Sequence, residues 1–382
     1  MDFQLSPEHE ELVRTLRQFA RKELAPRSRE WDRTGEFPWD AWKRMGEMGL
    51  LGLRAPAAYG GQDADLLTAG IAMEEIARGD FSCTYGIQLA GLAGEIIGRN
   101  GTEEMKRQWL PPTTRGEVVV ALALTEPGVG SDAANLACRA VRDGDHYVMT
   151  GEKSGISLGM VAQAAIVFAR TGGDRARGVT AFLVDLGLPG VSRSALRDMG
   201  SHAVGRAVLS FDGVRIPASA RLGAEGTGFY QIMQGFDFNR VFIGLACLGT
   251  ASESLEETMR YAKERRAFGK MLASFEGVSF GIAEMATHIE AARWLAYRTL
   301  WLADQGQPYT KEASMVKWWA PKLAVEAIHQ CLLLHGHYGY TDELPFEQRM
   351  RDVIGLEIGD GTAEIMKVIV ARELMGRETL PY

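Results

Sequence analysis

The hydrophobic period of this 382-residue chain changes twice, and these changes constrain the fold more than any other feature. Apolar residues recur at helical spacing to about residue 117, then alternate or run together in short β-branched segments to about residue 222. Helical spacing returns near residue 226 and persists. The pattern predicts an α+β chain with an N-terminal α-helical domain (1–117), a middle β-sandwich or barrel domain (118–223) and a C-terminal four-helix bundle (224–382).

Local signals predict individual helices within the two helical parts. Ser6 is a suitable N-cap, Pro7 occupies the first helical position, and glutamates follow near the positive end of the helix dipole. A helix that starts at Thr102 should end at Pro111, because proline lacks the N–H that a helix interior needs. The other expected helices cover residues 67–78, 85–98, 255–265, 282–304, 311–334 and 362–374.

The middle part consists of short β-branched runs punctuated by glycine and proline, which is typical of strands. Two alternating stretches flank Asp143-Gly144-Asp145 and predict a β-hairpin. Because helical patterns of about 10–15 residues are missing between the runs, a parallel βαβ sheet is disfavoured. The other expected strands are VVVALAL (118–124), AAIVFAR (164–170), GVTAFLVD (178–185) and AVLSFDGVRI (207–216).

Charge and cysteine usage narrow the function classes. The formal net charge of −7 argues against a general nucleic-acid binder. The four cysteines are far apart and form no CxxC pair, so neither a zinc ribbon nor a disulfide scaffold is expected, and a reducing cytoplasm suits them. The acidic start has no apolar leader segment, and no uncharged apolar run approaches the ~18 residues of a membrane span. We therefore expect a cytoplasmic protein without a membrane partner.

Three short motifs lack the context that their chemistry needs. Residues 128–133 match the G-x-G-x-x-[GA] dinucleotide fingerprint, but a strand follows where a helix is required. Residues 155–159 match the G-x-S-x-G nucleophile elbow, which requires a strand-to-helix turn on a doubly wound sheet. His335 and His337 have no further ligands to complete a metal site. We therefore predict no metal and neither of these two sites.

TEPGVGSD (125–132) is a more informative motif. It joins the end of a strand to a loop restricted by glycine and proline, with several backbone N–H groups and two hydroxyls. Such a loop can bind a carbonyl-rich ring or an anion, and it can equally be a structural turn.

Several motifs occur together and in order, and through them the whole chain resembles the acyl-CoA dehydrogenase family. They are TEPGVGSD, GEKSGIS (151–157), ERRAFGK (264–270), HGHYGY (335–340), LPFEQRMRD (344–352) and GDGTAEIMKVIVARELMGR (359–377). The resemblance implies FAD, an acyl-CoA substrate, a homotetramer or dimer, and an electron-transferring flavoprotein as the acceptor.

The resemblance also implies which residues form the site. Arg265 and Phe268 would reach the FAD of a neighbouring subunit. The implied FAD-binding set is Leu124, Thr125, Gly130, Ser131, Ser157, Arg265, Phe268, Gly336, Gly339, Thr362 and Glu364. The implied substrate-binding set is Ser131, Asp237, Arg240, Gly359 and Gly361.

The expected catalytic base departs from the family pattern. The family usually has a glutamate preceded by an aromatic residue, whereas this chain has Asp360 preceded by Gly359. The other common base position holds Asn239, which cannot accept the proton, so Asp360 is the expected base. Both changes make room beside the α-carbon and favour a cyclic or α-branched acyl group. The chain looks most like the cyclohexanecarboxyl-CoA dehydrogenase branch.

Other departures and alternatives remain. Gly155 and Leu158 stand where the family usually has an aromatic residue and an Asn or Ser, and Glu276 and Leu333 replace glutamines that contact FAD. Drift in an inactive paralogue would also explain Asp360 and Gly359. The competing functions are an acyl-carrier-protein dehydrogenase, a desulfinase-type relative and a non-catalytic flavoprotein of the same fold.

Overall fold

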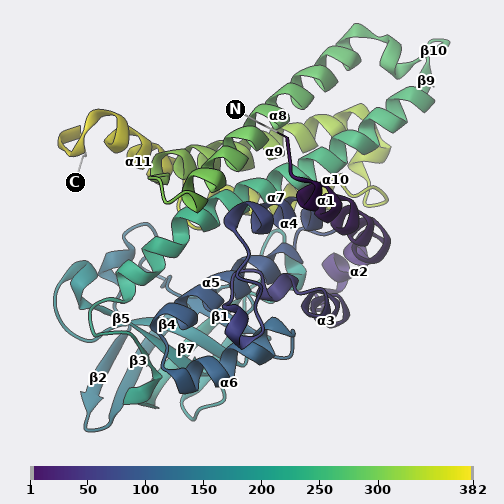
Figure 1. Ribbon diagram of the computed structural model, residues 1–382. Helices are drawn as coiled ribbons and strands as arrows, with labels where there is room; N and C mark the ends of the chain where they lie inside the picture. Colours follow the sequence, from purple (N-terminus) through teal and green to yellow (C-terminus); the bar gives the residue numbers. More distant parts are fainter. Residues whose placement is uncertain (1–3, 380–382) are drawn as a thin grey trace.

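The computed structural model describes residues 4–379 and places a β-sheet beneath a layer of long helices (Figure 1). The helices before the sheet and those after it pack together, while a hairpin of two short strands projects far from the sheet. The N-terminal helices are α1 (Pro7–Phe19), α2 (Ala25–Thr34), α3 (Trp39–Glu47), α4 (Leu66–Ala77), α5 (Thr84–Asn100) and α6 (Glu103–Thr114). The C-terminal helices are α7 (Gly228–Glu264), α8 (Glu276–Asp304), α9 (Thr310–Leu334), α10 (Phe346–Ile354) and α11 (Ala363–Met375).

The cap signals are confirmed, and one helix end is not. The Ser6 hydroxyl accepts a hydrogen bond from the N–H of His9 at 3.2 Å, as an N-cap should. Helix α6, however, continues through Pro111 and Pro112 to Thr114. Proline lacks an N–H but keeps its carbonyl, and the Pro111 carbonyl accepts from the N–H of Arg115. The expectation that the helix ends at Pro111 was wrong by one turn.

The middle part forms one continuous mixed sheet with a narrow junction. Strands run in the order β6-β7-β3-β2-β4-β5-β8, and β2 pairs with β4 only through Arg139 and Arg170. The predicted hairpin is the β2–β3 turn, where Asp143 pairs with His146. Strand β1 lies parallel to β4, but a hairpin rather than a helix connects them. The strands are β1 (Val120–Ala123), β2 (Arg139–Asp143), β3 (His146–Ile156), β4 (Ala164–Arg170), β5 (Val179–Asp185), β6 (Val191–Ala195), β7 (Ala207–Pro217) and β8 (Arg221–Leu222).

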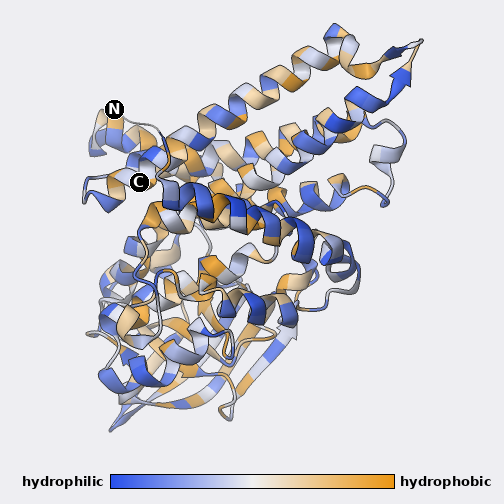
Figure 2. Ribbon diagram, turned by 45° about the vertical axis from the view of Figure 1, so that its right-hand side comes forward, coloured by the Kyte–Doolittle hydropathy of each residue, from blue (hydrophilic) through white to orange (hydrophobic). Residues whose placement is uncertain are grey.

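Helix α7 runs through the middle of the helical layer. Residues 238–255 are buried without interruption, so this stretch needs neighbours on every side. Helix α4 supplies one side, and α8 and α9 supply the others. The end of α7 and the hairpin β9 (Arg266–Ala267) to β10 (Lys270–Met271) are hydrophilic, as the blue colour in Figure 2 shows. Among residues 4–379, every helix is too short or too polar to cross a lipid bilayer.

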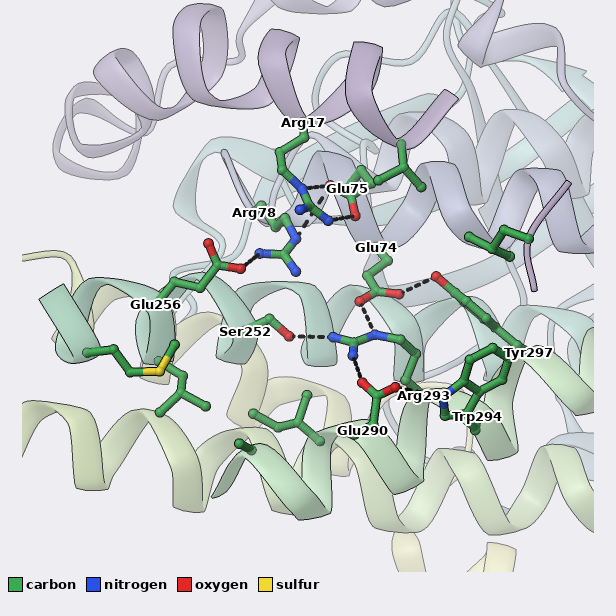
Figure 3. A pocket seen from close by; sticks show the side chains of 16 residues that line it. Arg17, Glu74, Glu75, Arg78, Ser252, Glu256, Glu290, Arg293, Trp294 and Tyr297 are labelled. Atoms are coloured by element: carbon green, nitrogen blue, oxygen red, sulfur yellow. Dashed lines mark hydrogen bonds and ion pairs between the residues drawn. The ribbon is translucent and has the colours of Figure 1, made fainter. Parts of the chain in front are cut away.

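Buried ion pairs join the N-terminal helices to the C-terminal bundle (Figure 3). Glu74 on α4 accepts hydrogen bonds from Arg293 and from the Tyr297 hydroxyl on α8, both at 2.7 Å. Arg78 binds Glu256 on α7 at 2.9 Å, and within the N-terminal part Glu75 binds Arg17 on α1 at 2.7 Å. These side chains line a groove of about 360 Å³ between α1, α4, α7 and α8. Each labelled charge already has a partner of opposite sign, which favours a structural role.

Removing Glu74 should therefore destabilise the protein. We expect Glu74→Gln to lower the free energy of unfolding by about 2 kcal/mol, since it leaves the half-buried Arg293 with only the exposed Glu290 as a counter-charge. Urea denaturation followed by circular dichroism measures this. The matched control is Glu10→Gln, because Glu10 lies 3.9 Å from Arg14 in an exposed pair and its loss should change stability by less than about 0.5 kcal/mol. Equal effects of both variants would contradict the structural role.

Candidate active site

Asp360 lies where three distant segments of the chain meet. It precedes α11, and its Oδ2 accepts hydrogen bonds from the Asn239 amide on α7 at 2.6 Å and from the Gln88 amide on α5 at 3.3 Å. Asn239 and Gln88 are both buried. Two amide donors thus converge on one carboxylate oxygen.

The backbone around Asp360 is held in an uncommon conformation. Asp360 has a φ of 56°, a left-handed value that a residue with a Cβ adopts only at a cost. Gly361 has a φ of 107°, and a Cβ there would lie 2.6 Å from the Met366 methyl group, so glycine is required. The ammonium of Lys317 on α9, fully buried, donates to the carbonyls of Leu356 at 2.6 Å and Gly361 at 3.0 Å. This clamp holds both ends of the segment that carries Asp360.

The electrostatics around Asp360 suit a proton acceptor. Burial raises the pKa of the Asp360 carboxyl, and the positive charges of Lys317, Arg240 and Arg206 together with the Asn239 hydrogen bond oppose that rise. Burial also lowers the pKa of Lys317 to about 8, against the attraction of Asp360. A carboxyl group with a raised pKa in a protected site is a candidate proton acceptor.

The expected CoA-binding residues lie beside this carboxylate. Arg240 is only 7% exposed and donates to Asp237 at 2.8 Å, while the Thr310 hydroxyl donates to the other Asp237 oxygen at 2.5 Å. The Nε of Arg240 has no hydrogen-bond partner among the described residues. Arg240 also lies 4.0 Å from the position of a Cβ on Gly361. The structure therefore brings Asp237, Arg240 and Gly361 together with Asp360.

A buried ion pair anchors the TEPGVGSD loop. The Lys153 ammonium, fully buried on β3, donates to Glu126 at 2.7 Å and to the Leu124 carbonyl at 2.9 Å. Glu126 also accepts from the N–H groups of Ala137 at 2.6 Å and Cys138 at 2.9 Å. Sequence analysis missed Glu126 and Lys153, although two charged residues at the edges of apolar strands were a usable signal.

The open face of this loop fits an acceptor-rich ligand such as FAD. Thr125 and Ser131 are exposed, and a Cβ on Gly130 would meet nothing within 4 Å. The backbone N–H groups of Gly130 and Ser131 donate to no acceptor within residues 4–379. Free amides and hydroxyls on an accessible, anchored loop are suitable partners for the carbonyls of a flavin ring.

Ser157 connects the sheet to the helical layer. Its hydroxyl accepts from the Arg206 guanidinium at 3.3 Å, and Arg206 also donates to the Tyr85 hydroxyl on α5 at 3.0 Å and to Asp198 at 2.7 Å. Arg206 and Tyr85 were not predicted. Neither stands in a recognisable motif, and only the folded chain places both near Ser157.

The remaining expected residues fall into two groups, one distant from Asp360 and one close to it. Arg265 and Phe268 are exposed at the projecting β9–β10 hairpin, far from the sheet that carries Thr125 (Figure 1). Gly336 lies in an open turn after α9. Gly339 is buried there, where a Cβ would come within 2.0 Å of the Leu332 carbonyl oxygen. Nearer to Asp360, Thr362 caps α11, Glu364 is exposed in its first turn, and Gly359 adjoins the carboxylate residue.

Within residues 4–379, no three His, Cys, Asp or Glu side chains are grouped so that they could hold a metal ion. The four cysteines are buried free thiols.

Comparisons with known proteins agree with the fold and the motifs. The chain matches the acyl-CoA dehydrogenase N-terminal domain over residues 6–117, the middle domain over 121–214 and the C-terminal domain over 226–375. It is 39% identical over 378 residues to the mitochondrial short-chain specific acyl-CoA dehydrogenase of Bos taurus, covering 97% of this chain and 91% of that protein.

Solved structures are similar over nearly the whole chain. Butyryl-CoA dehydrogenase from Megasphaera elsdenii superposes with a TM-score of 0.94 at 32% identity, covering 98% of this chain and all of that one. The prolyl acyl carrier protein oxidase AnaB has a TM-score of 0.92 at 30% identity, with coverages of 97% and 100%. Because the matches span all three parts and the site carries a carboxylate beside a buried arginine, this chain belongs to the acyl-CoA dehydrogenase family of FAD-dependent oxidoreductases acting on CH–CH bonds.

Proposed function

We propose that this protein introduces an α,β double bond into an acyl-CoA thioester, with Asp360 as the base that removes the α-proton. The observation that carries the proposal is the fixed Asp360 carboxylate. Two amides hold it beside buried Arg240, and Lys317 holds the backbone segment that carries it. A base must be ionised, positioned and protected from water, and this carboxylate has donors and cations that stabilise its anion.

The chain's own residues divide the remaining tasks. A thioester α-proton is weakly acidic, so hydrogen-bond donors must stabilise the enolate as it forms. FAD, when bound, supplies the acceptor for the β-hydride. Because Arg240 lies beside Asp360, we assign it to the thioester end of the substrate rather than to the distant phosphates and adenine of CoA. The residues that we propose for FAD are those of the anchored loop and its surroundings: Leu124, Thr125, Gly130, Ser131, Ser157, Gly336, Gly339, Thr362 and Glu364.

A second copy of the chain would complete the FAD site. Arg265 and Phe268 are exposed on a hairpin that projects away from the rest of the cluster (Figure 1). We propose that they contact the cofactor of a neighbouring subunit in a homotetramer, and that an electron-transferring flavoprotein reoxidises the enzyme.

We propose further that the acyl group is compact and α-branched or cyclic, such as cyclohexane-1-carboxyl. Gly359 stands where the family usually has an aromatic residue, so this position places no ring beside the Asp360 carboxylate. A Cβ at this position would have its nearest neighbours at 3.6 Å, the Gly355 carbonyl oxygen, and 3.8 Å, a Leu356 methyl group. The short-chain and butyryl-CoA enzymes among the relatives support an acyl group with few carbons. The small size of Gly359 supports an acyl group that is branched or cyclic at the α-carbon.

Anaerobic mixing with acyl-CoA thioesters tests the reaction. We expect cyclohexane-1-carboxyl-CoA to bleach the flavin absorption band of the wild-type holoenzyme. Asp360→Asn should lower the bleaching rate by about 10²- to 10⁴-fold, because the base is lost while the shape is kept. Unchanged FAD content and CoA binding in the variant provide the control. Full turnover by Asp360→Asn would contradict the assignment of the base.

Restoring an aromatic residue at position 359 tests the substrate class. Gly359→Phe should slow bleaching by cyclohexane-1-carboxyl-CoA by about 10- to 100-fold and leave butyryl-CoA much less affected, because the new ring fills the space beside the α-carbon. The φ of Gly359 is not in the left-handed region and a Cβ there meets only ordinary contacts, so the variant should fold. A wild-type preference for straight-chain thioesters would contradict the proposed role of Gly359.

Similarity to AnaB raises a second candidate, a carrier-protein thioester as the substrate. Matched CoA and acyl-carrier-protein thioesters of the same acyl group separate the two. We expect the CoA thioester to react faster. Faster reaction of the carrier-protein thioester would favour the second candidate.

A further inference from the structure

Asp360 is anchored through one oxygen only. Both amide donors, from Asn239 and Gln88, reach Oδ2. Within residues 4–379, Oδ1 has no hydrogen-bond partner, yet it does not belong to the fully buried unpartnered atoms, and Asp360 keeps part of its surface accessible. The carboxylate therefore has one fixed oxygen and one available oxygen.

We propose that Asn239 and Gln88 are positioning residues that hold Oδ2 of Asp360 so that Oδ1 receives the α-proton, an inference that rests on the proposed function. The substrate Cα–H bond breaks and an O–H bond forms on Oδ1. The electron pair of the Cα–H bond stays with the thioester and is available for the new double bond, for which FAD, when bound, would supply the hydride acceptor.

The side-chain oxygen of Asn239, which lacks a hydrogen-bond partner among the described residues, supports this role. Asn239 is fully buried on α7, and its Oδ1 has no hydrogen-bond partner among the described residues. A buried amide oxygen without a partner destabilises the fold, and a leucine of similar size would avoid that penalty. The useful feature of Asn239 is thus its N–H group, and the short bond to Asp360 is the contact that uses it.

The charges that face Asp360 come from several elements. Lys317 lies on α9, Arg240 on α7 and Arg206 just before β7, and all three favour the ionised carboxylate. The Tyr85 hydroxyl on α5 is buried nearby. Because amide donors also stabilise the anion, removing one raises the pKa of Asp360. The base then stays protonated to a higher pH, and the acidic limb of the reaction moves to higher pH.

Two readouts on the FAD-loaded, full-length protein test the proposal. The first is the pKa of Asp360, from the ¹³Cγ resonance of labelled aspartate, assigned by its loss in Asp360→Asn. The second is the acidic limb of the rate of flavin bleaching. We expect Asn239→Leu to move both upward by about one to two pH units, the size of one hydrogen bond to a charged group. Gln88→Met should move both in the same direction by less, since its bond is longer.

Gln231→Leu is the matched control. Gln231 is another buried amide on α7, but it donates to the Leu222 carbonyl at 2.9 Å and the Thr227 hydroxyl at 3.0 Å, away from Asp360. Its loss should lower stability without moving the pKa of Asp360. The proposal would be overturned if Asn239→Leu left the pKa of Asp360 and the acidic limb unchanged, or if the control shifted them equally. If Asn239→Leu does not fold, the same two readouts in Gln88→Met decide. Failure of every acyl thioester to bleach wild type would refute the proposed function, whereas the resonance still reports the anchoring.

Discussion

The continuous burial of α7 is the constraint on which the rest of the structure depends. A helix buried on all sides over residues 238–255 cannot be stable with neighbours from the C-terminal part alone, because the side that faces α4 would remain open to water. The two helical parts, separated in sequence by the whole sheet, thus form one layer. This arrangement also sets the site: α7 carries Asn239 and Arg240, α5 brings Gln88 from before the sheet, and the segment before α11 brings Asp360.

The same burial explains where sequence reasoning about the fold stopped. The two changes of period were sufficient to predict the α, β, α order and the β2–β3 hairpin. The start of α7 was missed, and its length underestimated, because a helix that is apolar all round has no periodic contrast between two faces. Helix α10 was missed because LPFEQRMRD is short and mostly polar. The prediction that α6 ends at Pro111 was wrong, because the last turn of a helix tolerates the loss of N–H donors better than its interior does.

The site was predictable to the extent that its residues stand in motifs. Asp360, Asp237 and Arg240 were identified from motif positions, and the structure brings them together. Lys317, Gln88 and Arg206 could not be found this way, since each looks like an ordinary helix or loop residue and gains its role only through a contact across the fold. Arg265 and Phe268 stay predictions, because their proposed partner lies on a second chain.

The left-handed backbone of Asp360 has a consequence for how this residue can be replaced. Glycine would adopt that conformation without strain, but Asp360→Gly would also leave the buried amides of Asn239 and Gln88 without their acceptor. Lys317, Arg240 and Arg206 would lose the negative charge that they face. Backbone strain and side-chain partners thus act in opposite directions at this one position, and the fold keeps the carboxylate for its own stability as well as for the chemistry.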